Sequence, residues 1–111
     1  MSPTDLTLVA KHVMKLLVER RFEELAAAAQ GEGLSADDMA GAIDDVGGPP
    51  AMPPEHVWRD LRFRSIAGRP GAWSLTLHLW TAHGRTPATV ELTAYTRNGR
   101  PVVQVDDIIS T

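Results

Sequence analysis

Two adjacent carboxylates near the end of the chain, Asp106 and Asp107, are the residues best suited to acid–base chemistry. Neighbouring residues of a strand face opposite sides of a sheet, so we expect one carboxylate to face a helical layer and the other to face outward. A buried carboxylate can serve as a general base or as an anchor for a ligand. The alternative is a structural aspartate that caps a loop or pairs with an arginine.

The four histidines, His12, His56, His78 and His83, show no spacing typical of a metal site. In an extended segment "HVWRD", His56 and Asp60 would lie about 13 Å apart on one side, too far to share one ion. There are no cysteines, which excludes disulfides, thiolate metal ligands and cysteine nucleophiles. The sequence therefore predicts a protein without a metal ion or other cofactor.

The segment "AWSLTLHLWT", residues 72–81, alternates apolar leucines with polar and aromatic side chains. If the neighbouring segments pair with it as a meander, the sheet presents one outward row of aromatic, arginine and threonine side chains. We call these residues the outer-face row: Arg62, Arg64, Thr76, His78, Trp80, Glu91, Thr93 and Tyr95. Such a composition is typical of protein interfaces, which predicts a homodimer. The alternatives are coverage by the chain's own loop 47–55 and a platform for a small molecule.

Three helices are expected to position these residues. Ser2, Pro3 and Asp5 form an N-terminal cap, and apolar side chains follow at helical spacing as far as Leu17. "RRFEELAAAA" predicts a short second helix, and "LSADD" opens a third one capped by Ser35. The helical half is expected to span residues 1–46.

Beyond residue 46 the pattern changes. "GGPPAMPPE", residues 47–55, contains four prolines and predicts a linker loop that joins no sheet. Residues 56–111 then alternate with period two in four segments joined by short turns, with Asn98-Gly99 as the strongest hairpin signal. The 111 residues therefore predict a single α+β domain, with three helices packed on one face of a four-stranded antiparallel meander.

The order of these elements, with "RFEELAAAA" in the second helix and "VQVDDIIST" in the last strand, resembles the nuclear-transport-factor-two-like cone. The piece "LHLWTAHGRTPATVELTAY" followed by "VQVDD" is more similar to a small bacterial family of unknown function. The first resemblance implies a cone-like sheet whose concave face holds either a core or a pocket. The second implies no activity.

Composition limits the classes of partner. The net charge of −3 and the pI near 5.7 give no general attraction to nucleic acid. No apolar run approaches the ~18 residues of a membrane span, and no secretory signal opens the chain, so we expect a cytoplasmic protein without membrane contact. The excess of arginine over lysine and the many alanines indicate a GC-rich bacterial source.

These patterns favour a bacterial binding or accessory protein that acts through its outer sheet face as a homodimer or with a protein partner, for example as an immunity-type protein. The alternative is a small cofactor-independent isomerase or cyclase. It would place Asp106 or Asp107 as a base in a pocket between helices and sheet, lined by Trp58, Phe63 and Trp73.

Overall fold

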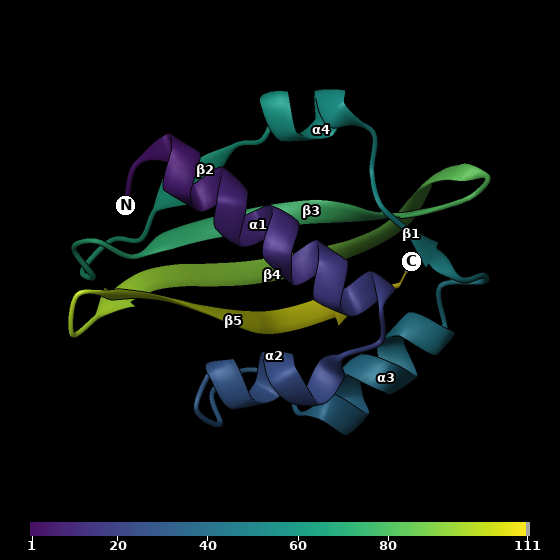
Figure 1. Ribbon diagram of the computed structural model, residues 1–111, viewed down its shortest axis with the longest axis horizontal. Coiled ribbons are helices and arrows are strands. Elements are labelled where there is room, and N and C mark those ends of the chain that lie inside the picture. Colours follow the sequence, from purple (N-terminus) through teal and green to yellow (C-terminus); the bar gives the residue numbers. More distant parts are fainter. Residues whose placement is uncertain (111) are drawn as a thin grey trace.

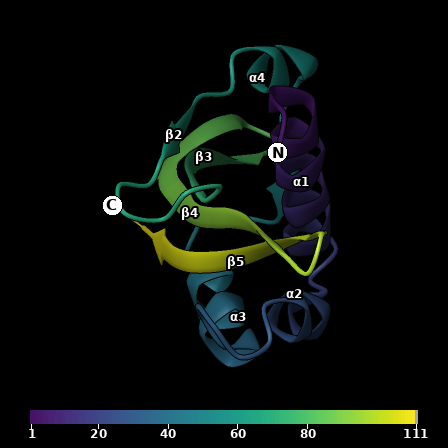
Figure 2. The same ribbon diagram turned by 90° about the vertical axis from the view of Figure 1, so that its left-hand side faces the viewer.

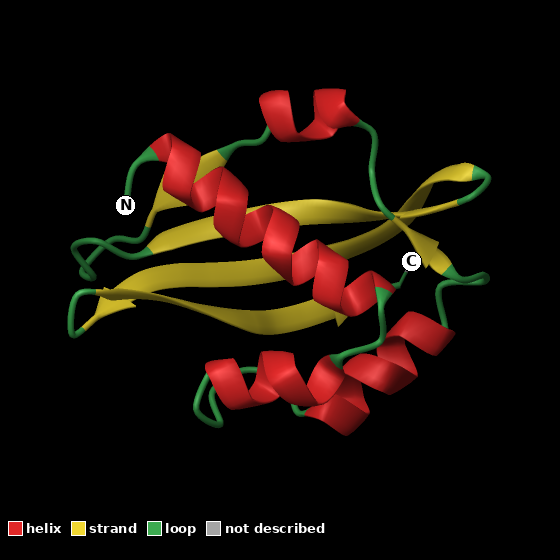
Figure 3. Cartoon of the chain, in the orientation of Figure 1, coloured by secondary structure: helices red, strands yellow, loops and turns green. Residues whose placement is uncertain are grey.

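The computed structural model describes residues 1–110 and shows a twisted antiparallel sheet of five strands (Figures 1 and 3). The strands are β1 (Pro50–Ala51), β2 (Phe63–Ser65), β3 (Trp73–Thr81), β4 (Gly84–Arg97) and β5 (Arg100–Ile109). Their order is β1-β3-β4-β5. β1 and β2 pair with the same edge of β3, β1 near its end and β2 near its beginning. The predicted α+β class and the meander of the three long strands are confirmed.

Four helices accompany the sheet: α1 (Pro3–Val18), α2 (Phe22–Ala28), α3 (Ala36–Asp44) and α4 (Glu55–Arg59). The predicted cap of α1 is present: the Asp5 amide donates to the Ser2 hydroxyl at 3.1 Å, and the Ser2 amide donates to the Asp5 carboxylate at 3.1 Å. Ser35 caps α3 in the same way, accepting from the Asp38 amide. The N-terminal half therefore begins its helices where the sequence predicts.

Helix α1 lies in the concave side of the curved sheet, and the main core fills the space between them (Figure 2). Leu6, Met14 and Leu17 of the helix are fully buried, as are Leu75 and Leu92 of the two central strands. Burial of such side chains stabilises the fold by about 1.5–3 kcal/mol each. This layer of one helix on one sheet is the frame that positions every residue discussed below.

The other two N-terminal helices do not lie on that face, which corrects the predicted layer of three. Helices α2 and α3 flank the edge strand β5 (Figure 1), where the Leu34 amide donates to the Val105 carbonyl at 2.8 Å. A Cβ on Gly33 would lie 2.4 Å from that carbonyl oxygen, so only glycine permits the approach. The loop thus satisfies a carbonyl on the edge of β5 that pairing with β4 leaves free.

The expected loop over residues 47–55 and the expected strand start at residue 56 are both wrong. Pro50 and Ala51 pair with Thr81 and Trp80, because proline is tolerated in an edge strand whose free side faces away from the sheet. Residues 55–59 form α4, with Pro54 at its N-cap in the extended conformation. The edge of the sheet is therefore built from β1 and β2, with α4 looping out between them (Figure 3).

Two irregularities interrupt the pairing of β4. Between the pairs His78–Thr89 and Trp80–Arg85, three residues of β4 stand opposite the single residue Leu79. Pro87 lies in the middle of the three and lacks an amide proton, and the Thr86 hydroxyl donates to the Leu79 carbonyl at 2.7 Å instead. The second irregularity is a bulge in β5 at Asp106.

Candidate functional site

The outer-face row is divided into three environments by the fold. One end is covered by the chain itself, the centre is exposed, and the other end borders a cleft beneath α4. Each environment places its residues differently from the uniform row that strict alternation predicts.

The covered end holds Thr93 and Tyr95, which are only 7% and 8% exposed. Two guanidinium groups lie near the Tyr95 ring, with Arg69 at 5.2 Å and Arg97 at 5.4 Å from the ring centroid. Arg97 also donates to the Tyr95 hydroxyl at 3.0 Å. These two residues of the row are therefore packed within the chain, and little of their surface is left for a partner.

The exposed centre carries opposite charges on its two sides. Arg64 of β2 pairs with Ser74 of β3, while Glu91 of β4 stands between Thr76 of β3 and Asp107 of β5. All five side chains are exposed. Arg62 and Arg64 line a shallow hollow of about 370 Å³ together with Ser74 and Thr76, which places both arginines on this face. The centre is thus basic beside β2 and acidic across β4 and β5.

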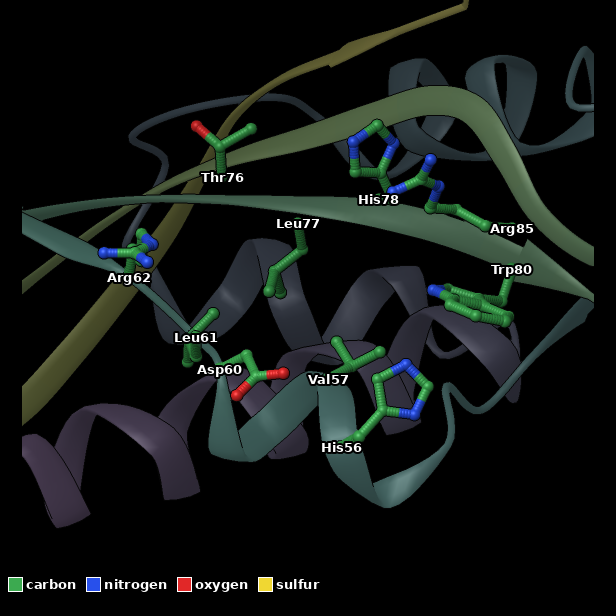
Figure 4. Close-up of a pocket in the computed structure, with 10 residues that line it drawn as sticks. All are labelled: His56, Val57, Asp60, Leu61, Arg62, Thr76, Leu77, His78, Trp80 and Arg85. Atoms are coloured by element: carbon green, nitrogen blue, oxygen red, sulfur yellow. The ribbon is translucent and has the colours of Figure 1, made fainter.

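At the other end, a cleft of about 320 Å³ lies between α4 and β3 (Figure 4). Helix α4 contributes His56 and Val57, and Asp60, Leu61 and Arg62 follow it. The opposite wall is formed by Thr76, Leu77, His78 and Trp80 of β3, with Arg85 of β4 at one end. His56 and Asp60 come together because four residues make one helical turn, so their predicted separation in a strand is wrong.

Strict alternation predicts that Trp80 and His78 lie on the same side of β3. In the structure they lie on opposite sides. Figure 4 shows Trp80 and Leu77 on the side of β3 that faces α4, with Thr76 and His78 on the opposite side. This change of side coincides with the pairing irregularity between His78 and Trp80, where the strands are expected to twist more strongly. The Trp80 indole meets the His56 imidazole edge to face, with ring centroids 6.2 Å apart.

His78 stays exposed and contacts Thr86, one of the three β4 residues that stand opposite Leu79. Its Nδ1 lies 3.1 Å from the Thr86 carbonyl oxygen. A carbonyl can only accept, so Nδ1 carries the proton and donates. In the neutral ring this leaves Nε2 as a free acceptor at the border of the cleft.

Among residues 1–110, part of the β3 edge that faces the cleft has no strand partner. β2 pairs with residues 73–75 and β1 with residues 80–81, which leaves 76–79 open. The Ala72 carbonyl accepts from Ile66 on the β2 side, and the Leu79 carbonyl accepts from Thr86 on the β4 side. Even-numbered residues therefore direct their backbone groups toward the cleft. Among residues 1–110, no backbone hydrogen bond outside the ladders engages Thr76 or His78.

The predicted inward carboxylate at residue 106 or 107 is wrong. Buried Val105 and Ile108 are three residues apart, and the bulge between them puts Asp106 and Asp107 both on the outer side. The Asp106 carboxylate accepts from the Thr93 hydroxyl at 2.6 Å and from the side-chain amide of Gln104 at 2.7 Å. Asp107 is exposed and accepts from the Ile108 amide at 2.9 Å. Neither carboxylate lines the cleft.

The three aromatic residues of the predicted interior pocket are not brought together around one cavity. Trp58 is buried in the core, with the Lys11 ammonium 5.8 Å from its ring centroid. Phe63 and Trp58 line a surface groove between α1 and α4, of which Trp73 is not a part. Trp73 packs against the core, and its indole nitrogen is buried without a hydrogen-bond partner in the described chain.

The sequence interpretation missed Arg85 and the α4 side of the cleft. The signal for α4 was present: Pro54 followed by Glu55 is a favourable helix start, and Val57, Trp58 and Leu61 have helical spacing. Across residues 1–110, no cluster of three or more His, Asp or Glu side chains is arranged to hold a metal ion. No helix of the same residues is both long and apolar enough to cross a bilayer.

Residues 14–110 match the model of a protein family described as "Domain of unknown function (DUF7668)". No curated protein and no solved structure matches the chain. The expected resemblance to a small family of unknown function is confirmed to that extent, and the match implies no activity.

Proposed function

Because this chain belongs to the DUF7668 family of domains of unknown function, we propose from its own geometry that it is a binding or accessory domain. Its binding surface is the exposed centre of the outer sheet face, and its first partner is a second copy of the chain. The observation that carries the proposal is the division of this centre into a basic side at Arg64 and an acidic side at Glu91.

The charge division suits a symmetric dimer. Two sheets packed face to face are related by a two-fold axis that lies in the plane between them. With that axis parallel to β3, the β2 side of one copy lies over the β4 side of the other. Arg64 of each copy then approaches Glu91 of its partner, and the small Thr76 sits near the axis. The alternative axis, perpendicular to the strands, would place arginine over arginine and is disfavoured by repulsion.

The face is available for such packing. Figure 2 shows α1 on the concave side of the strands, and no helix of residues 1–110 covers the centre of the opposite side. Ser74 and Thr76 are exposed, and their short side chains leave room for a second sheet at the usual spacing of about 10 Å.

A different protein partner would use the same face. The net charge of −3 suits an immunity-type protein that masks a basic partner, and the acidic side formed by Glu91 and Asp107 is where such a partner would dock. The curved sheet holds α1 in its concave side (Figure 2), which leaves the outer side for association.

Sedimentation equilibrium at tens of micromolar tests the proposal. We expect a dimer for the wild type and a folded monomer for Arg64→Glu, which puts like charges opposite each other. Arg100→Glu makes the same charge change at the β4–β5 turn, where Arg100 pairs with Arg97, six residues along β4 from Glu91, and it should stay dimeric. A monomeric wild type would exclude self-association, and equal effects of the two variants would exclude this face.

A further inference from the structure

The cleft between α4 and β3 combines three features that the proposed dimer does not use. They are an open stretch of strand edge, an apolar wall, and arginine side chains at the ends. Its volume of about 320 Å³ lies at the lower end of the range of small-ligand sites.

The open strand edge requires polar partners. Thr76 and His78 direct their backbone N–H and C=O groups into the cleft, as the alternation of β3 shows. Thr76 and His78 are two residues apart along the strand, a separation of about 6.6 Å. An extended ligand with an amide bond can pair with one of them as a neighbouring strand does.

The apolar wall limits the body of the ligand. Val57 and Leu77 face each other across the cleft, and the Trp80 indole closes one end (Figure 4). The His56 ring meets that indole edge to face, a contact that favours the observed orientation of the indole. An apolar or aromatic side chain fits this region better than a second polar group.

The charged groups around the cleft favour one negative charge. Arg62 and Arg85 bear positive charge, and neither takes part in an ion pair of the described residues. Among residues 1–110, Asp60 is the only one with a carboxylate side chain that lines the cleft. Figure 4 shows the Arg85 side chain next to His78, at the same end of the cleft as Trp80. There it can receive a carboxylate, and Asp60 disfavours ligands with two negative charges.

We propose that this cleft binds a short extended ligand that carries a carboxylate, an adjacent amide and an apolar side chain. This chemistry is shared by N-acyl amino acids and by the C-terminus of a peptide. The carboxylate binds Arg85, the amide pairs with the free edge of β3 at Thr76 or His78, and the side chain packs between Trp80 and Leu77.

The probes are N-acetylphenylalanine, its C-terminal amide, and a Gly-Ala-rich hexapeptide that ends in phenylalanine, added to the ¹⁵N-labelled full chain. We expect saturable shifts of backbone amides in residues 55–60 and 76–80 with the free acid, and at least about tenfold weaker binding of the amide. Binding of the acid but not the hexapeptide assigns the site to a small molecule. Binding of the hexapeptide at the same amides assigns it to a peptide terminus.

Two variants separate the site from the rest of the molecule. Arg85→Gln should weaken the free acid about tenfold, while Arg100→Gln should leave the affinity unchanged. Arg64→Glu should keep the site even as a monomer, so failure of the dimer and failure of the cleft are distinguishable. Equal affinity for acid and amide, shifts confined to other surfaces, or no saturation by any probe at millimolar concentration would overturn the proposal.

Discussion

The His56 imidazole stands edge-on to the Trp80 indole, with ring centroids 6.2 Å apart and an interplanar angle of 75°. The contact joins α4 to β3 at the closed end of the cleft. Pairs of this geometry contribute about 0.5–1.5 kcal/mol beyond the area that they bury. We therefore expect His56→Ala to lower the free energy of unfolding by about 1 kcal/mol and to speed amide exchange within α4. His83→Ala, in the β3–β4 turn, is the matched control and should change neither measurement.

The Thr86 hydroxyl replaces a backbone donor that Pro87 cannot supply to the Leu79 carbonyl. Thr86→Val keeps the size of the side chain but leaves that carbonyl without its partner, which should cost about 1–3 kcal/mol in urea unfolding. Thr86→Ser keeps the hydroxyl and should cost clearly less. If the serine and valine variants lose equal stability, the hydrogen bond does not support the irregularity.

The alternation of β3 makes a sharp contrast between neighbouring positions. Leu75 is 1% exposed in the core, whereas Ser74 faces solvent. Leu75→Ala should destabilise the chain by about 2–5 kcal/mol, as large-to-small changes in packed interiors do. Ser74→Ala should cost well under half of that value. Similar losses at both positions, measured by chemical unfolding, would mean that β3 is buried on both faces.

The cap of α1 predicts a pH dependence. The hydrogen bond from the Ser2 backbone amide, followed by that from its hydroxyl, lowers the pKa of Asp5 below its ordinary value. A group whose folded pKa is depressed stabilises the fold above its unfolded pKa and loses this effect as the pH falls through the folded pKa. Asp5→Asn should therefore lower the melting temperature at pH 7, and the difference from the wild type should shrink as the pH falls through the folded pKa of Asp5. A difference that persists in acid would contradict this account.

Local signals predicted much of the fold. Ser2 and Ser35 cap helices because their hydroxyls can reach an amide three residues on, and this depends on adjacent sequence alone. Asn98 and Gly99 both adopt positive φ in the β4–β5 turn, as the hairpin signal predicts. The three long strands follow from their period-two pattern.

The errors arose where long-range pairing decides the structure. The sequence around Pro50 predicts a loop, because proline has no amide proton to donate to a neighbouring strand. In the structure Pro50 pairs with the edge of β3 at Thr81. Pro87 and Asp106 lie in irregular stretches of pairing, and a shift of one residue reverses the side that every later residue faces. The cleft depends on this long-range pairing, since β1 bounds its open edge and Trp80 faces α4 next to the irregularity at Leu79. The alternation of polar and apolar residues along the sequence does not show which strands pair or where their pairing is irregular.

The central claim is that two copies of this chain associate through the outer sheet face with Arg64 opposite Glu91. Exchange of charges tests it most directly, by sedimentation of Arg64→Glu, of Glu91→Arg, and of an equimolar mixture of the two. In a two-fold dimer each single variant places like charges together, while the mixed pair restores an opposite-charge contact at both symmetric positions. We predict monomers for each variant alone and a heterodimer for the mixture. A mixture that stays monomeric while the wild type is dimeric would contradict the claim.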